Sequence, residues 1–481
     1  MKHCSGILSL VSIAVVLSVG VETSLGQARS TQPNTQPTAA TATKPAAAPA
    51  TGANQAAIPN LPADNAGPEA TSDTNALDSI PEVREGLELL NNGERAQAAA
   101  LFAAAYKKRP DLIPAGAAVA VALFNGRQFD QARFWLEKTI DDCPSDPEAY
   151  IALAEVAQLE GRLYEAKLLA AQGANLAGQY KSNAQRQKKL AIRSQLVVIM
   201  VSEKKGNWED AKTRLEALIT REPEEPEYLT RLGVVLFQMD DLEKSLKVFG
   251  QAIEKGAQLP PPYALVAQLL NQKGRTQEAK TYISEAVKNN QTNFQVMSVA
   301  ANLAVQWEMI PQAKQYAERA LKLNPESLDA QAMCGLIALY EQNFEQAQKY
   351  YEGILKADPN NFYGKNGLAL ALCEQTDQTK VSMGLAYAKQ NAEANPQSID
   401  ALSTWAWTSL KAGQMDMAEN ILNRIQNSGV ISAAGAYYLA EIKQLKGDTE
   451  LATTLANAAL STKNNYPKRV AAQELLNKLQ K

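Results

Sequence analysis

Histidine is almost absent from this sequence of 481 residues, and neither sign of charge is in excess. The one histidine, His3, lies two residues from Met1, so a processed chain would contain none. This excludes His-ligated metals, Ser-His-Asp and Cys-His nucleophilic sites, and histidine acid–base catalysis. The 48 Lys and Arg residues nearly balance 51 Asp and Glu residues, giving a net charge of −3. The sequence therefore lacks the basic excess that is typical of nucleic-acid-binding proteins.

Cysteine is also scarce, with only Cys4, Cys143, Cys334 and Cys373 in the chain. There is no C-x-x-C motif, which excludes a zinc knuckle and a thioredoxin-like redox motif. Gly-rich phosphate loops, G-x-S-x-G and calcium loops are missing as well. We therefore expect no enzyme activity, no cofactor, no metal site and no complete disulfide framework, although one disulfide pair stays open.

The composition of residues 1–79 does not predict a folded domain. Residues 1–28 are typical of a signal peptide, with Lys2, an apolar run at 7–19 and small residues before cleavage after Gly26 or Ala28. The alternative is an uncleaved anchor, but the apolar run is short for a membrane span. Residues 29–79 contain seven prolines among Thr, Ala, Gln and Asn, which predicts a disordered linker. We expect an exported protein that is periplasmic, associated with the cell envelope, or secreted.

A repeat begins near residue 80. A small residue, usually alanine, recurs with a large or apolar residue four positions later and a small or apolar residue seven positions later. The successive first markers are residues 98, 132, 166, 211, 245, 279, 313, 347, 384, 418 and 452. Eight of the ten steps between them are 34 residues, and a second small residue precedes most markers by twelve positions. This spacing places the markers on one stripe of a helix.

The 34-residue period, the paired small residues and the glycine-containing turns resemble the tetratricopeptide repeat (TPR) family. The resemblance implies an all-α fold, an α-solenoid superhelix of about eleven helix–turn–helix repeats over residues 80–464. It also predicts that residues 465–481 form a capping helix with Val470, Leu475, Leu476 and Leu479 on one side.

Two insertions interrupt the period. Residues 175–187 add eleven positions beside a basic stretch, which predicts either a lengthened helix pair or a contact with an acidic partner or between solenoid segments. The basic residues are Lys181, Arg186, Lys188, Lys189 and Arg193. A three-residue insertion at 375–380 predicts a longer inter-helix loop. Arg193 and Lys204 do not reproduce the Lys and Asn pattern of chaperone-binding TPR proteins, because Glu203 lies between them.

In the TPR family, the first helices of stacked repeats line a concave groove. The resemblance assigns this chain's groove positions to neutral amides and aromatics, which suit an extended peptide backbone or sugar hydroxyls. The candidate residues are Gln268, Asn271, Gln272, Gln295, Ser298, Asn302, Gln306, Tyr340, Tyr363, Asn366, Trp407 and Tyr437. Alternatively, the amides are ordinary exposed helix residues, and the aromatics fill gaps between repeats.

The sequence favours an exported, non-catalytic TPR scaffold or adaptor that binds protein partners, as peptides or folded domains, in its concave groove. The alternative is a cell-envelope assembly or polysaccharide-export component whose groove contacts glycan. We expect no nucleic-acid partner and no stable membrane span after signal cleavage.

Overall fold

The computed structural model describes residues 81–109, 113–125, 128–427, 431–461 and 466–480, and all regular secondary structure within these ranges is helical. The all-α, solenoid prediction is therefore confirmed. The predicted signal peptide and linker lie outside the described residues. None of the helices in the described ranges is long and apolar enough to cross a membrane. The chain divides into two compact units, called here the N-terminal unit, which ends at Pro262, and the C-terminal unit, which runs from Tyr263 to Lys481.

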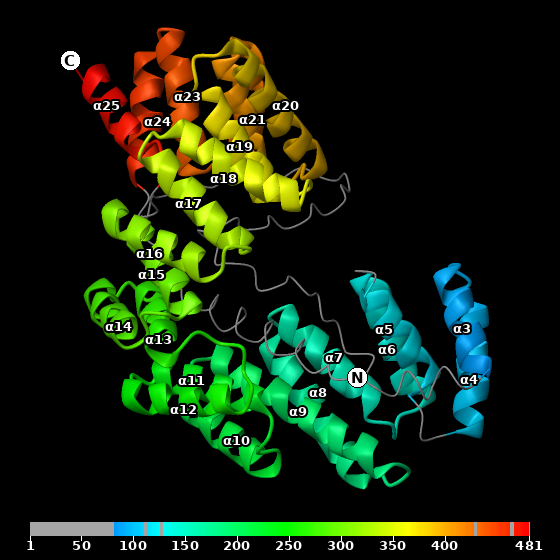
Figure 1. The fold of residues 1–481 in the computed structure, drawn as a ribbon. Coiled ribbons are helices and arrows are strands. Elements are labelled where there is room, and N and C mark those ends of the chain that lie inside the picture. Colours follow the sequence, from blue (N-terminus) through cyan, green and yellow to red (C-terminus); the bar gives the residue numbers. More distant parts are fainter. Residues whose placement is uncertain (1–80, 110–112, 126–127, 428–430, 462–465, 481) are drawn as a thin grey trace, which may run out of the picture. The chain divides into compact units, whose positions relative to one another are not determined.

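The N-terminal unit contains ten described helices, and successive helices lie side by side in pairs (Figure 1). Their bounds are α3 Pro81–Asn91, α4 Arg95–Lys108, α5 Ala115–Asn125, α6 Phe129–Asp142, α7 Glu148–Leu159, α8 Leu163–Gln179, α9 Ala184–Lys204, α10 Trp208–Arg221, α11 Pro226–Gln238 and α12 Leu242–Glu254.

The C-terminal unit continues the same arrangement. Its helices are α13 Pro262–Gln272, α14 Thr276–Asn289, α15 Phe294–Gln306, α16 Ile310–Leu323, α17 Leu328–Tyr340, α18 Phe344–Ala357, α19 Phe362–Cys373, α20 Gln378–Ala394, α21 Ile399–Lys411, α22 Met415–Asn427, α23 Ala433–Leu445, α24 Thr449–Ser461 and α25 Arg469–Leu479. The first helix of each pair therefore has an odd number, and the second has an even number.

The small residues that mark the repeat let the two helices of a pair approach closely. Every first marker, from Ala98 to Ala452, is buried. On the first helices, a Cβ added at Gly233 would lie 2.5 Å from the Phe249 ring. The large residue four positions after the marker therefore fills the space that the glycine leaves in its own pair. Tyr351 does more, because its ring meets Gly335 of its own pair and Gly367 of the next pair.

The eleven-residue insertion lengthens two helices. The α8 helix has 17 residues and α9 has 21, against 13 or 14 in most neighbours. A lengthened helix pair, one of the two alternatives, is therefore what the structure contains. The two basic residues of α9 that point inward, Arg186 and Arg193, are held by carboxylates of the same unit.

The three-residue insertion lengthens the inter-helix loop by only one residue, because residues 374–377 separate α19 from α20 and residues 341–343 separate α17 from α18. The prediction that the loop takes up the insertion is therefore wrong for most of it. The α20 helix begins at Gln378, directly after its N-cap Asp377, and has 17 residues. Its marker Gly384 is consequently the seventh residue of the helix, whereas Ala347 is the fourth residue of α18. The extra residues form one more turn at the start of the helix, because the Asp377 carboxylate accepts the backbone N–H of Thr379 and caps it.

The predicted C-terminal helix is observed as α25, which packs against α24. Leu475 and Leu476 are buried, as is Ala472. The prediction for Val470 is wrong, since its side chain is 67% exposed. Five positions separate Val470 from Leu475, which places them well apart around a helix of 3.6 residues per turn.

Candidate functional site

Two adjoining cavities lie along the first helices of the C-terminal unit. The larger has a volume of about 280 Å³ and is lined mainly by α15, α17 and α19. The smaller has a volume of about 120 Å³ and is lined mainly by α19, α21 and α23. Leu339, Asn366, Leu370 and Pro467 line both cavities. We call this continuous feature the groove.

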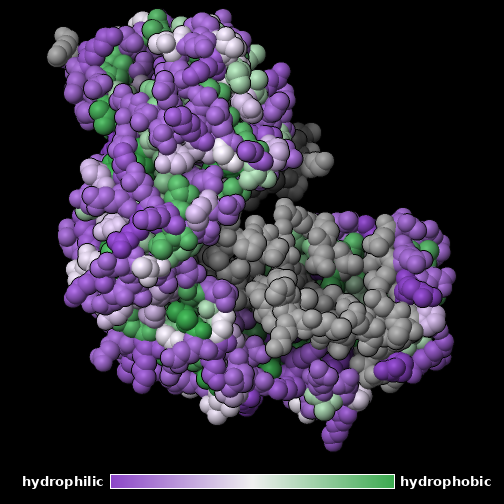
Figure 2. All heavy atoms as spheres, in the orientation of Figure 1, coloured by the Kyte–Doolittle hydropathy of each residue, from purple (hydrophilic) through white to green (hydrophobic). Residues whose placement is uncertain are grey.

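The floor of the larger cavity is apolar. Ala330, Met333 and Leu336 of α17 contribute to it, together with Leu370 of α19. Figure 2 shows a hydrophobic strip beside α15 and α17 on a surface that is otherwise mostly hydrophilic. Polar side chains from α15 form one wall of the cavity, so an occupant would meet apolar carbon below and hydrogen-bonding groups at the side. This combination is typical of sites that bind an organic ligand or a peptide.

Carboxylates line both cavities, Asp329 the larger one and Asp400 the smaller one. Asp329, Tyr363 and Asp400 occupy the second position of α17, α19 and α21, respectively. Surrounding protein desolvates both carboxylates and raises their pKa. The pKa of Tyr363 is raised by burial first and then by the negative charges of Asp400 and Asp329, which places the phenol near both. Its side chain is 42% exposed, so this row of side chains is accessible.

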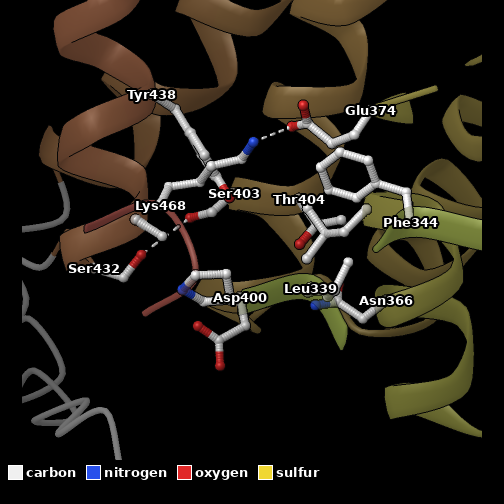
Figure 3. Close-up of a pocket in the computed structure, with 13 residues that line it drawn as sticks. Leu339, Phe344, Asn366, Glu374, Asp400, Ser403, Thr404, Ser432, Tyr438 and Lys468 are labelled. Atoms are coloured by element: carbon white, nitrogen blue, oxygen red, sulfur yellow. Dashed lines mark hydrogen bonds and ion pairs between the residues drawn. The ribbon is translucent and has the colours of Figure 1, made fainter. Parts of the chain in front are cut away.

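The smaller cavity contains one strongly paired carboxylate, Glu374, at the end of α19 (Figure 3). Its oxygens lie 2.7 Å from Lys468 Nζ and 3.2 Å from Lys411 Nζ, and it accepts the indole N–H of Trp407 at 2.7 Å. Burial alone would raise the pKa of Glu374, but the two ammonium groups and the indole hold it below its usual value. Glu374 is therefore charged and fully partnered at neutral pH.

The segment that precedes α25 enters the groove. Tyr466 is buried, Pro467 lines both cavities, and the Lys468 ammonium lies 5.7 Å from the centre of the Phe344 ring and 5.5 Å from that of Trp407. Arg469 Nε lies 3.3 Å from Glu308 Oε1 at the end of α15. The C-terminal segment thus connects groove residues that are far apart in the sequence.

The structure brings five of the twelve predicted groove residues to the larger cavity: Ser298, Asn302, Gln306, Tyr363 and Asn366. Asn366 is notable because its Oδ1 atom is buried and has no hydrogen-bond donor in the described part of the chain. An N–H group from an occupant would satisfy it, since buried acceptors without a partner are costly.

The remaining amides lie away from the cavities. Gln272 and Gln295 are exposed, and Gln268 is half-buried. Asn271 belongs to a chain of hydrogen bonds, in which Trp307 Nε1 donates to Asn271 Oδ1 at 2.7 Å and Asn271 Nδ2 donates to Gln306 Oε1 at 2.7 Å. Gln306 Nε2 continues the chain by donating to Asn302 Oδ1. These amides therefore hold the first helices α13 and α15 together. Tyr340, another predicted groove residue, is half-buried.

The expectation that Trp407 and Tyr437 present faces to a partner is wrong. Both side chains are 4% exposed. The Trp407 ring stacks on Tyr438 with a centroid separation of 4.4 Å, and the Tyr437 hydroxyl donates to Glu441 at 2.7 Å. These aromatics fill the space between neighbouring repeats, which was the alternative interpretation.

The predicted set misses Asp329, Asp400, Glu374 and the segment Pro467–Lys468. Asp329, Tyr363 and Asp400 all lie six residues before the small residue of their first helix. The same positional rule therefore identifies the two aspartates when it is applied to every repeat. No comparable signal exists for Pro467 and Lys468, because they lie outside the repeat pattern.

Two of the basic residues near the insertion, Arg186 and Arg193, face inward rather than toward a partner. Arg186 makes two hydrogen bonds to Asp146, at 2.9 and 3.0 Å, and Arg193 pairs with Glu148 and Glu155. The neighbouring Lys204 donates to the Gln158 carbonyl at 2.7 Å. The acidic-partner interpretation is therefore wrong for Arg186 and Arg193. They join α9 to α7 and to the turn before it.

The described residues contain no cluster of His, Cys, Asp and Glu that suits a metal ion. Cys143, Cys334 and Cys373 are free thiols. Burial raises the pKa of Cys334 to about 11 and that of Cys373 still further, which disfavours the reactive thiolate.

Comparison with known proteins gives matches of one kind. One family profile described as tetratricopeptide repeat matches residues 83–147, 203–260 and 333–380, and a second with the same description matches residues 260–293. A search of curated proteins finds no match.

Several solved structures are similar to this chain. A tetratricopeptide repeat protein from Parabacteroides merdae is 18% identical, with 53% of this chain and 99% of that chain covered and a TM-score of 0.43. Yeast Tom70 is 14% identical, with 85% and 96% covered and a TM-score of 0.34. Pseudomonas aeruginosa PilF is 17% identical, with 46% and 99% covered and a TM-score of 0.35.

Proposed function

Since the chain belongs to the tetratricopeptide repeat family, we propose that it is a non-catalytic adaptor whose groove binds an extended segment of a protein partner. The observation that carries this proposal is the groove itself, with an apolar floor, a polar wall and carboxylates that line both cavities. An extended peptide has side chains for the floor and regularly spaced N–H and C=O groups for the walls.

The depth of the groove supports a segment rather than a flat protein surface. Its larger cavity, at about 280 Å³, has room for one or two apolar side chains. The buried Asn366 Oδ1 offers an acceptor for a backbone N–H at the point where the two cavities meet. A bound segment running along the first helices would contact several repeats at once, which is how repeat proteins build extended binding surfaces.

Site-specific photo-crosslinking tests this function. A benzophenone amino acid replaces Tyr363 in the full chain, and the adducts formed in the producing cells are identified by mass spectrometry. The matched control carries the same amino acid at Tyr164, which is 73% exposed on the second helix α8. We expect a defined protein adduct from position 363 that is absent from position 164 and is lost when Ala332→Trp fills the groove. Equal adducts from both positions would contradict the proposal.

We also propose that the protein is exported, because residues 1–28 combine Lys2, the apolar run at 7–19 and small residues near Gly26 and Ala28. N-terminal sequencing of the protein isolated from its producing cells tests this. We expect the mature chain to begin at Gln27 or Arg29. An intact N-terminus at Met1 would refute cleavage.

The glycan alternative loses support from the positions of its aromatic residues. It was motivated by the groove amides and aromatics, and two of those aromatics, Trp407 and Tyr437, are buried between repeats. A protein segment is therefore the occupant that the groove chemistry favours.

A further inference from the structure

Two carboxylates of the groove have no partner within the described part of the chain. No ion pair or hydrogen bond is found there for the side chains of Asp329 or Asp400, and both line a cavity. In Figure 3 the Asp400 carboxylate stands clear of the dashed contacts that join Glu374 to Lys468. Each aspartate begins a first helix whose N-cap is already supplied by Ser327 or Ser398. Neither carboxylate is therefore needed to cap its helix.

The two carboxylates belong to one row, in which Asp329 lines the larger cavity and Asp400 lines the smaller one. Asp329, Tyr363 and Asp400 occupy equivalent positions in three successive repeats, so they form one row along the groove. The Tyr363 phenol senses the negative charge of both aspartates. A cation at this row would meet the negative charge of Asp329 or Asp400, which are exposed side chains whose carboxylates the surrounding protein desolvates in part, and Coulomb attraction there is stronger than in bulk water. An anionic group, such as a peptide C-terminus, would be repelled.

One basic segment of the chain itself lines the groove. Pro467 and Lys468 lie in it in a non-helical conformation, and the Lys468 ammonium lies against Glu374 and beside two aromatic rings. Pro467 and Lys468 thus form part of the wall of the smaller cavity, where the Lys468 ammonium pairs with a carboxylate. Because Lys411 and Lys468 are both committed to Glu374, they do not neutralise the Asp329–Tyr363–Asp400 row.

We propose that the groove selects a partner segment in which Lys or Arg lies next to a large apolar residue, the cation at the Asp329–Tyr363–Asp400 row and the apolar side chain in the larger cavity. This inference rests on the proposed function, because it assumes that the groove is the binding site. It specifies the chemistry of the partner segment, a basic and apolar peptide, in place of a neutral or acidic one.

Selection from a random peptide library tests the proposal. Phage that display random 12-residue peptides are enriched on the immobilised full-length protein, and the best peptide is then synthesised with its basic residue intact or replaced by glutamine. We expect enriched peptides to carry Lys or Arg within two positions of Leu, Met, Ile or Phe. Replacing the basic residue by glutamine should weaken binding about tenfold, the value of one charge-assisted contact.

A charge-matched pair of variants locates the effect. Asp329→Asn with Asp400→Asn should weaken the basic peptide about tenfold, and should leave the glutamine peptide unchanged. Glu345→Gln with Glu393→Gln removes the same charge from the second helices α18 and α20 and should change neither affinity. Circular dichroism melting checks that both double variants fold.

The outcomes separate the two proposals. If peptides are enriched without a basic preference, or if the aspartate variant weakens both peptides equally, the cation-selective site is refuted while the peptide-binding groove stands. If Ala332→Trp leaves the enriched peptides bound with full affinity, the groove is not their site and the proposed function fails.

Discussion

Replacing Arg186 by methionine should strongly destabilise the N-terminal unit. The guanidinium and the Asp146 carboxylate are only 8% and 3% exposed, and two parallel hydrogen bonds join them. The same guanidinium reaches Glu148 at 3.2 Å. Methionine keeps an unbranched apolar stem but has no guanidinium, so it leaves two buried carboxylates with fewer partners. The unpaired carboxylates destabilise the fold more than the loss of the Arg186–Asp146 attraction does, because an uncompensated buried charge carries the full cost of desolvation.

The magnitude follows from that cost. Removing one partner of a buried ion pair costs about 3–5 kcal/mol. For a unit of this size, each kcal/mol lowers the melting temperature by roughly 2–4 °C, so a fall on the order of 10 °C is expected. Arg186→Lys should give a smaller fall, because lysine keeps the charge but cannot form the two parallel hydrogen bonds.

Thermal melting followed by circular dichroism measures the effect, with Lys181→Met as the control. Lys181 is an exposed basic residue that precedes the same helix, so its variant should melt close to the parent. If Arg186→Met melts no lower than Lys181→Met, the buried pair does not stabilise this unit and the reasoning is wrong.

Acid sensitivity gives an independent check. Burial raises the pKa of Glu148, but Arg193 and Arg186 lower it more, so the net shift is downward. A carboxylate with a lowered folded pKa contributes stability above its unfolded pKa and loses it as the pH falls through the folded value. Removing Arg186 should raise that folded pKa. The variant should therefore lose stability at a higher pH than the parent during acid titration.

Three further outcomes are expected. Gly367→Ala should lower the free energy of unfolding by about 1–3 kcal/mol in urea titrations, because the new Cβ would lie 2.2 Å from the Tyr351 ring. Trp407→Ala should lower the free energy of unfolding by about 3–5 kcal/mol. Tyr363→Ala should weaken partner binding and change the free energy of unfolding by less than about 0.5 kcal/mol. If Tyr363→Ala destabilised the protein and Trp407→Ala did not, Tyr363 would be the structural residue. The Cys373 thiol should resist iodoacetamide in the folded protein and react after unfolding, and rapid native labelling would contradict its burial.

The fold was predictable because each repeat has a small residue at the position where its two helices pack together. Ala98, Ala132 and Ala166 recur at the crossing of two helices, where only a small side chain fits, and each is at most 1% exposed. A helix pair of this kind makes contacts that are local in the sequence. Position within one repeat therefore predicts burial in every other repeat.

The candidate groove was only partly predictable, because some of its contacts depend on distant parts of the chain. The positional rule placed Tyr363 and Asn366 correctly at the larger cavity. It placed Trp407 at an exposed position, but Glu374 accepts its indole N–H and Lys468 lies beside its ring. Lys468 is outside the repeat, so no periodic pattern indicates that the groove would be covered there.

The ion pairs of the C-terminal segment give the C-terminal unit an unusual mechanical character. A solenoid whose repeats contact only their neighbours can extend and twist easily, because each interface between repeats deforms independently of the others. Here Lys468 and Arg469 tie the last helix back to α19 and α15 through Glu374 and Glu308. Stretching the C-terminal unit along its length would have to break these two ion pairs. The unit should therefore resist extension more than a solenoid without such contacts. The same ties set an order of assembly, because the groove reaches its final shape only after Lys468 and Arg469 have been synthesised and have paired with Glu374 and Glu308.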